Sequence, residues 1–258
     1  MLTHREFSAW IVSNNQPLPE YLVAVDEKAG RVSCWIPSEA GKQFSVHWRD
    51  HGSNVHTCSF ISLDGFVVPG RFLYGTGNAS REGVRSGPTS ERPFIFAEYH
   101  GASSSRECNR NTGTIMLKIK RVSLDGHKRA NPFQTIPDAG SRATVSGHCV
   151  GYGDERPTYE QCPSTWQIKP YDKASKGSYV TFVFRYRPQD FLLSQGIMSE
   201  DDRTAESAVP QRKARPSQRR VTSAPVATTH ATGTLITPSP TPSPNTKKMQ
   251  SVVRFSFA

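Results

Sequence analysis

Apolar and polar residues alternate with a period of two over short runs in the first part of the chain. Between residues 20 and 74, runs rich in valine, phenylalanine, tryptophan and isoleucine are separated by turn-forming residues. In residues 43–49, the alternation places Phe44, Val46 and Trp48 on one face and polar residues on the other. Such runs predict antiparallel strands. We expect the rest of the fold to be built around this stretch.

The same kind of pattern predicts strands as far as residue 186. They are residues 7–12, 21–25, 31–36, 43–49, 55–63, 66–68, 71–74, 93–99, 114–122, 165–169 and 178–186, with one or two short strands near residues 143–150. Gly30 and Asp64-Gly65 lie where hairpin turns need positive φ angles. Pro69-Gly70 predicts a bulge or an edge position. Residues 75–92 are small and polar, and predict a long surface loop.

Strands at hairpin spacing, without helical crossovers between them, favour a mainly β fold. We expect a single antiparallel β-sandwich, jelly-roll-like in outline, and a partly closed barrel is the alternative. One short C-terminal helix is predicted after the last strand. Pro188 suits its first turn, Asp190 favours the positive N-terminal end of the helix dipole, and Gly196 suits its end.

The composition changes at residue 197. From there on, Ser, Thr, Pro, Ala and charged residues dominate, and aromatic residues are absent until Phe255. Such a segment buries too little apolar surface to offset the entropy of ordering it. The sequence therefore predicts a β-rich domain over residues 1–196 and a disordered, basic, Ser/Thr/Pro-rich tail over residues 197–258.

The net charge of +10 is shared between these two parts. The tail holds nine Lys/Arg and four Asp/Glu, so half of the excess lies in about a quarter of the chain. Its most basic run predicts a nuclear-localisation or nucleic-acid patch, and a plain solubilising charge run is the alternative. The basic residues of this run are Arg212, Lys213, Arg215, Arg219 and Arg220.

A row of Ser/Thr-Pro dipeptides follows the basic run. Proline-directed phosphorylation there would add strong negative charge within reach of the basic run and mask it. An ordinary proline-rich linker is the alternative. The candidate phosphorylation sites are Thr237, Ser239, Thr241 and Ser243.

Two local patterns resemble chemical sites, but the sequence lacks what each needs. His47, His51, His56 and Cys58 lie close in sequence, yet no second ligand pair at zinc-finger spacing accompanies them. Residues 147–151 (GHCVG) match a nucleophile elbow, but a helix does not follow and the only later histidine lies in the tail. We therefore predict no catalytic, cofactor-binding or metal-binding residues and no cofactor.

The N-terminus lacks the pattern of a signal peptide, and no run approaches the ~20 apolar residues of a membrane span. The cysteines are odd in number and form no CxxC pair, so free thiols in a reducing, intracellular setting are expected. Nucleus and cytoplasm are both open, and the basic run favours the nucleus. The cysteines are Cys34, Cys58, Cys108, Cys149 and Cys162.

Several segments resemble a known family. FSAWIV, PLPEYLVAVDEKAGRVSCWIPSEAGKQFSVHW, ISLDGFVVPGRFLYG, ERPFIF, IMLKIKRV and YVTFVFRYRPQDFLLSQGI are similar to domain of unknown function 7918, from mushroom-forming (basidiomycete) fungi. The resemblance covers about residues 1–198 and implies no activity, substrate or cofactor.

The sequence leaves two classes of function open. The first is a non-catalytic binding or scaffolding domain for a protein partner, with a regulatory tail. The alternative is an enzyme, or a small-molecule or carbohydrate-binding protein, that uses a pocket in the sandwich.

Overall fold

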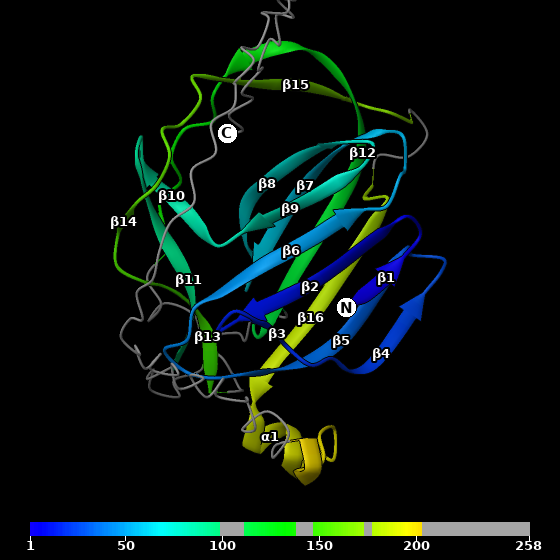
Figure 1. Ribbon diagram of the computed structural model, residues 1–258, viewed down its shortest axis with the longest axis vertical. Helices are drawn as coiled ribbons and strands as arrows, with labels where there is room; N and C mark the ends of the chain where they lie inside the picture. Colours follow the sequence, from blue (N-terminus) through cyan, green and yellow to red (C-terminus); the bar gives the residue numbers. More distant parts are fainter. Residues whose placement is uncertain (99–110, 138–146, 173–176, 203–258) are drawn as a thin grey trace, which may run out of the picture.

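A computed structural model describes residues 1–98, 111–137, 147–172 and 177–202. The strands of these residues lie in three hydrogen-bonded sheets (Figure 1). In the first sheet the order is β1-β2-β6-β9, and β3 pairs with β2. Its strands are β1 (Leu2–His4), β2 (Phe7–Ser13), β3 (Gln16–Pro17), β6 (Phe44–Asp50) and β9 (Gly77–Arg81).

The other two sheets are the smallest and the largest. The second sheet has the order β10-β11-β13, with β14 on β11. Its strands are β10 (Gly83–Gly87), β11 (Ser90–Glu98), β13 (His148–Tyr152) and β14 (Arg156–Pro157). The third sheet has the order β4-β5-β16-β12-β7-β8, with β15 on β12. Its strands are β4 (Tyr21–Asp26), β5 (Arg31–Ser38), β7 (His56–Leu63), β8 (Phe66–Tyr74), β12 (Thr114–Arg129), β15 (Ser164–Pro170) and β16 (Val180–Pro188).

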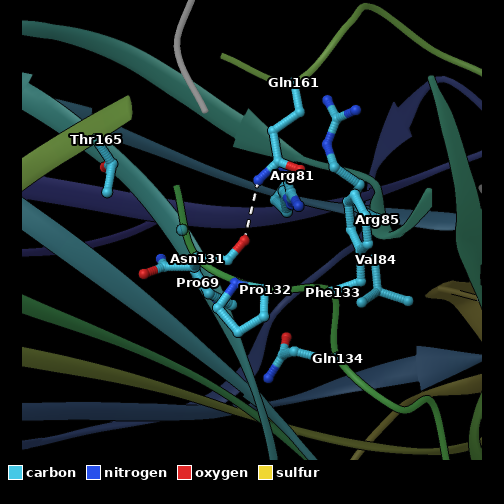
Figure 2. A pocket seen from close by; sticks show the side chains of 11 residues that line it. Pro69, Arg81, Val84, Arg85, Asn131, Pro132, Phe133, Gln134, Gln161 and Thr165 are labelled. Atoms are coloured by element: carbon cyan, nitrogen blue, oxygen red, sulfur yellow. Dashed lines mark hydrogen bonds between the residues drawn. The ribbon is translucent and has the colours of Figure 1, made fainter. Parts of the chain in front are cut away.

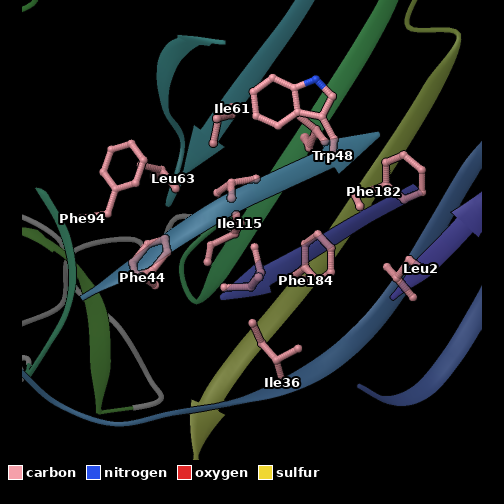
Figure 3. Packing of buried hydrophobic residues seen from close by; sticks show 14 of the residues in the cluster. Leu2, Ile36, Phe44, Trp48, Ile61, Leu63, Phe94, Ile115, Phe182 and Phe184 are labelled. Atoms are coloured by element: carbon pink, nitrogen blue, oxygen red, sulfur yellow. The ribbon is translucent and has the colours of Figure 1, made fainter. Parts of the chain in front are cut away.

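The core lies between the first and third sheets and also takes in buried side chains of the second sheet, such as Phe94 (Figure 3). Phe44, Val46 and Trp48 of β6 are at most 3% exposed, as the alternation predicts. Each such burial stabilises the fold by about 1.5–3 kcal/mol. The facing side chains of the third sheet come from strands far apart in sequence. They include Ile61, Leu63, Ile115, Phe182 and Phe184.

The structure confirms the predicted mainly β fold with antiparallel sheets. It departs in one pairing, because β16 runs parallel to β5 while the other paired strands of the described residues are antiparallel. The predicted C-terminal helix is α1 (Gln189–Ser194), which begins directly after β16. The described chain continues past the predicted boundary at 196, and Met198 is only 4% exposed. No helix of the described ranges combines the length and apolarity that a membrane crossing requires.

The predicted bulge or edge position at Pro69-Gly70 is confirmed. Strand β8 is the last strand of its sheet, and its register against β7 shifts between Cys58 and Phe60. The backbones approach closely there, so that a Cβ atom on Gly70 would collide with Ser59 Oγ. Ser59 Oγ in turn bonds to the backbone of Arg71, accepting from its N–H and donating to its carbonyl.

The prediction of a long surface loop over residues 75–92 is wrong. This segment forms β9, β10 and the start of β11, separated only by short connections. Tertiary pairing overrides its weak strand propensity, because β9 adds to β6 and β10 adds to β11. The small residues serve close packing, since a Cβ atom on Gly83 would lie 2.7 Å from the carbonyl oxygen of Arg92.

A buried carboxylate joins three segments of the second and third sheets. Asp64, in the turn between β7 and β8, is 4% exposed. Its Oδ1 atom accepts hydrogen bonds from the N–H groups of Gly113 (2.8 Å) and Thr114 (3.1 Å). Its Oδ2 atom accepts from Val150 N–H at 2.7 Å and from the Tyr186 hydroxyl at 2.6 Å. Burial, followed by the nearby Asp64 carboxylate, holds the pKa of Tyr186 well above its ordinary value, so the hydroxyl keeps its proton.

Candidate functional site: an arginine-lined pocket

A small pocket opens where strands of all three sheets meet the segment after β12 (Figure 2). Its volume is about 60 Å³. We call it the arginine pocket. It is lined by Pro69, Gly70, Arg81, Val84, Arg85, Asn131, Pro132, Phe133, Gln134, Gln161 and Thr165.

Arg81 is the last residue of β9, where the chain leaves the first sheet, and a single residue separates it from β10 of the second sheet. Arg81 lies at this junction between sheets and is only 9% exposed. Its Nε atom is buried without a hydrogen-bond partner among the described residues. Burial lowers the pKa of Arg81, but a guanidinium stays protonated in proteins. The pocket thus contains a buried positive charge with an unused donor.

Two further guanidinium groups lie beside Arg81. Arg85 is also 9% exposed, and its Nη1 atom donates to the carbonyls of Pro88 (2.8 Å) and Tyr159 (2.9 Å). Arg71, on β8, donates from Nε to the carbonyl of Ser80 at 2.9 Å. The ring of Tyr159 lies under both cations, 4.7 Å from Cζ of Arg85 and 5.7 Å from Cζ of Arg71. These contacts fix the two side chains in place.

The pKa of Tyr159 reflects the positive charge of the neighbouring arginines. Burial by itself raises the pKa of this phenol, but attraction to Arg71 and Arg81 opposes it and the net pKa is lowered. Among the described residues, no carboxylate oxygen lies within 4.0 Å of a guanidinium nitrogen of Arg71, Arg81 or Arg85. The three arginines are therefore not neutralised by direct ion pairs.

The acidic side chains of Glu91 and Glu82 are already engaged with another arginine. Arg156 Nη2 lies 2.8 Å from Oε1 of Glu91 and 3.0 Å from Oε2 of Glu82. Hydrogen bonding to Glu91 is the main reason that the pKa of Arg156 is raised. These acids reduce the local positive charge but leave the pocket itself without an anion.

Side-chain amides fix another part of the pocket wall. Gln161 Nε2 donates to the carbonyl of Asn131 at 3.1 Å, as the dashed line in Figure 2 shows. Gln134 Nε2 donates to the carbonyl of Val67 at 2.7 Å. The first bond ties residue 131 to residue 161 and the second ties residue 134 to β8, so this segment forms a fixed wall of the pocket. Phe133 is 45% exposed at its edge.

The lining chemistry suits an anion and lacks acid–base groups. The polar lining residues are two arginines, an asparagine, two glutamines and a threonine, without a carboxylate or an imidazole. Guanidinium groups bind carboxylate and phosphate oxygens through charge-assisted hydrogen bonds. General acid–base catalysis needs a titratable group within reach of the substrate. The arrangement can therefore hold an oxyanion.

Sequence reasoning did not find this site, because it assigned residues 75–92 to a loop. The available signal was a pair of arginines four residues apart, Arg81 and Arg85, in an otherwise small and polar segment. That pattern is equally typical of solvated surface charge. The two sets of residues that the sequence did single out lie outside the described residues. They are the basic run (Arg212, Lys213, Arg215, Arg219 and Arg220) and the Ser/Thr-Pro row (Thr237, Ser239, Thr241 and Ser243).

The clustered histidines take separate partners. His47 Nε2 lies 2.8 Å from Ser45 Oγ, and His51 Nε2 lies 2.7 Å from Ser8 Oγ. His56 makes an edge contact with the ring of Tyr74 instead. No group of three or more potential metal ligands occurs in the part of the chain that the structure describes.

The GHCVG motif is a strand and not an elbow. His148 to Gly151 belong to β13, which pairs with β11. Cys149 is completely buried, so its sulfur cannot meet a substrate. Cys34 and Cys58 are also buried thiols, and burial raises the pKa of Cys58 to about 11.

The histidine of this motif predicts an acid-sensitive fold. His148 lies 2.8 Å from Ser38 Oγ through Nδ1, and burial lowers its pKa, as burial does for His47. Below pH ~6.5 the unfolded chain therefore binds more protons than the native state. We expect the free energy of unfolding to be highest above that pH and to fall as the pH drops towards the native pKa. The loss is ~1.4 kcal/mol for each unit by which the native pKa lies below the unfolded one. Urea unfolding at pH 7.5 and 5.5 measures it.

The His148→Asn variant is the control for this prediction. Asparagine retains a polar side chain to face Ser38 but does not titrate, so the pH dependence should become shallower and His47 should account for part of the remainder. An equal slope in both proteins would contradict the assignment.

Comparison with known proteins places the chain in a family. The family model described as "Domain of unknown function (DUF7918)" matches residues 6–201. No curated protein and no solved structure matches significantly. The matched part spans most of the described strands, including β8, β9 and β10, which build the arginine pocket. The family predicted from the sequence segments is therefore confirmed, and the chain belongs to the DUF7918 family.

Proposed function

We propose that this chain is a non-catalytic binding domain that holds an anionic group of its ligand in the arginine pocket. The observation that carries the proposal is Arg81, a buried guanidinium with an unused Nε donor. Burying a charge without a partner costs several kcal/mol. Such a cost is common at binding sites, where the ligand supplies the missing partner.

At the arginine pocket itself, the lining favours binding over catalysis. The arginines and amides supply hydrogen-bond donors, and the lining holds no carboxylate or imidazole to move a proton. A volume of about 60 Å³ is also far below the ~300–1,000 Å³ of sites that enclose a whole small molecule. A sugar ring would not fit inside it.

The remaining parts of the proposal rest on sequence. The partner is a protein, and the domain works inside the cell, where buried thiols such as those of Cys34 and Cys58 stay reduced. The basic run over residues 212–220 serves as a nuclear address or as a contact to nucleic acid. We also propose that the protein comes from a mushroom-forming fungus, as the resemblance of the sequence segments suggests.

A thermal-shift titration with sulfate and with inorganic phosphate tests the anion site. The full chain should gain melting temperature as either anion saturates, because a ligand of the native state stabilises it by RT ln(1 + [L]/Kd). The Arg81→Met variant should lose the saturable part of this gain. Arg31→Met removes an exposed arginine at the start of β5 and should behave as the wild type.

General salt effects are separated by a chloride titration at equal ionic strength. Equal shifts in the wild type and in Arg81→Met would show that the anions act on the surface as a whole. That result would remove the pocket from consideration.

A further inference from the structure

We infer that the arginine pocket takes the phosphate of a phosphorylated residue in the chain's own Ser/Thr-Pro row, residues 237–244. This inference rests on the proposed anion site and names its ligand. It joins a feature of the fold to the row of Thr237, Ser239, Thr241 and Ser243 that the sequence singles out.

The charge and size of the pocket favour a phosphate monoester. A phosphoresidue carries about −1.5 to −2 charges at pH 7 and three acceptor oxygens, which match three neighbouring guanidiniums better than a single carboxylate does. The volume of about 60 Å³ has room for one oxyanion group and not for the body that carries it. The carrier must therefore lie outside, across the edge of the pocket.

The edge of the pocket is suited to a peptide that contains proline. Pro69, Pro132 and the half-exposed Phe133 line the pocket together with Arg81 and Arg85. A phosphorylated residue in this row is followed directly by a proline, whose apolar ring would contact them. Aromatic and proline side chains form the usual contacts of proline-rich peptides.

The length of the chain permits the contact within one molecule. Residues 202 and 239 are 37 positions apart (239 − 202), and a chain spans up to ~3.4 Å per residue, or ~125 Å in all. A domain of about 200 residues has a radius of gyration of only about 16 Å. Attachment to the same chain also raises the effective concentration of the peptide to the order of millimolar.

The test uses the full, unphosphorylated chain and a labelled synthetic peptide of residues 235–248. Fluorescence anisotropy compares the peptide with phosphoserine at position 239, the unphosphorylated peptide, free O-phosphoserine as a competitor and inorganic phosphate as a competitor. We expect the phosphopeptide to bind at least tenfold more tightly than each of the other three. Arg81→Met should weaken it about tenfold or more, as loss of a charge-assisted hydrogen bond does, and Arg31→Met should not.

Each other outcome has a distinct meaning. If inorganic phosphate binds in an Arg81-dependent way and the phosphopeptide binds no better, the anion site stands and the peptide inference is overturned. If O-phosphoserine competes as well as the phosphopeptide, a small phosphomonoester is the ligand and the peptide edge is not used. If Arg81→Met binds the phosphopeptide as the wild type does, the peptide contacts another basic surface and the inference is wrong. If no phosphate compound binds, the proposed anion site fails as well.

Discussion

Replacing Asp64 with asparagine should lower the free energy of unfolding by about 3–5 kcal/mol, because it breaks a buried charged network. The two carboxylate oxygens accept four hydrogen bonds, from Gly113, Thr114, Val150 and the Tyr186 hydroxyl. An amide offers one oxygen only, and its NH₂ group would face donors that need an acceptor. Urea unfolding followed by tryptophan fluorescence measures the loss.

The matched control is Asp26→Asn. Asp26 is the last residue of β4, is exposed, and accepts one hydrogen bond from the Ala29 N–H at 3.0 Å. Surface changes of this kind usually stay within about 0.5 kcal/mol. Tyr186→Phe removes one donor from the network and should fall between the two, near 1–2 kcal/mol. A loss below about 1 kcal/mol for Asp64→Asn would show that the carboxylate does not join these segments.

The importance of Asp64 could be seen only in part from the sequence. The Asp64-Gly65 pair predicts a hairpin turn, and the structure has both residues at positive φ, 50° and 91°. A turn aspartate is ordinarily explained by this local geometry. Its partners come from residues 113, 114, 150 and 186, and nothing in the sequence near residue 64 indicates them.

The strands of the core were predictable because burial on one face leaves a period of two in the sequence. Residues 44–48 and 115–119 alternate, and each inward side chain is buried in the structure. Burial on both faces was also indicated in β5, where Val32, Cys34 and Ile36 are buried while Trp35 is partly covered on the other face. These patterns state which side chains face inward. They do not state which strands are neighbours, so the parallel pairing of β16 with β5 was not foreseen.

The strands that build the site were not predictable, for a related reason. In β9 and β10 the buried positions are filled by Arg81 and Arg85 as well as Val84, so the alternation of apolar and polar residues is lost. A segment whose buried positions are cationic looks like solvated loop when only hydrophobicity is considered. The departure of sequence pattern from structure is itself informative, because local rules are most often broken at functional sites.

The last prediction is that the buried charge of Arg81 serves binding at the expense of stability. The Arg81→Met variant should be more stable than the wild type by about 1–3 kcal/mol in buffer without phosphate or sulfate. Methionine fills a similar apolar volume as the arginine stem. It also removes a buried charge for which attraction to Tyr159 and Glu91 is opposed by repulsion from Arg71 and Arg85. Urea unfolding in chloride buffer measures the gain, with Arg31→Met expected within about 0.5 kcal/mol of the wild type.

The sign of the difference should depend on the ligand. At a concentration of 100 times Kd, an anion stabilises the wild type by about 2.7 kcal/mol and leaves the variant unchanged. The two unfolding curves should then approach each other or change order. If Arg81→Met is instead destabilised in chloride and gains as much from phosphate as the wild type, Arg81 is a structural residue whose guanidinium is stabilised by its surroundings. In that case the pocket does not need an anion.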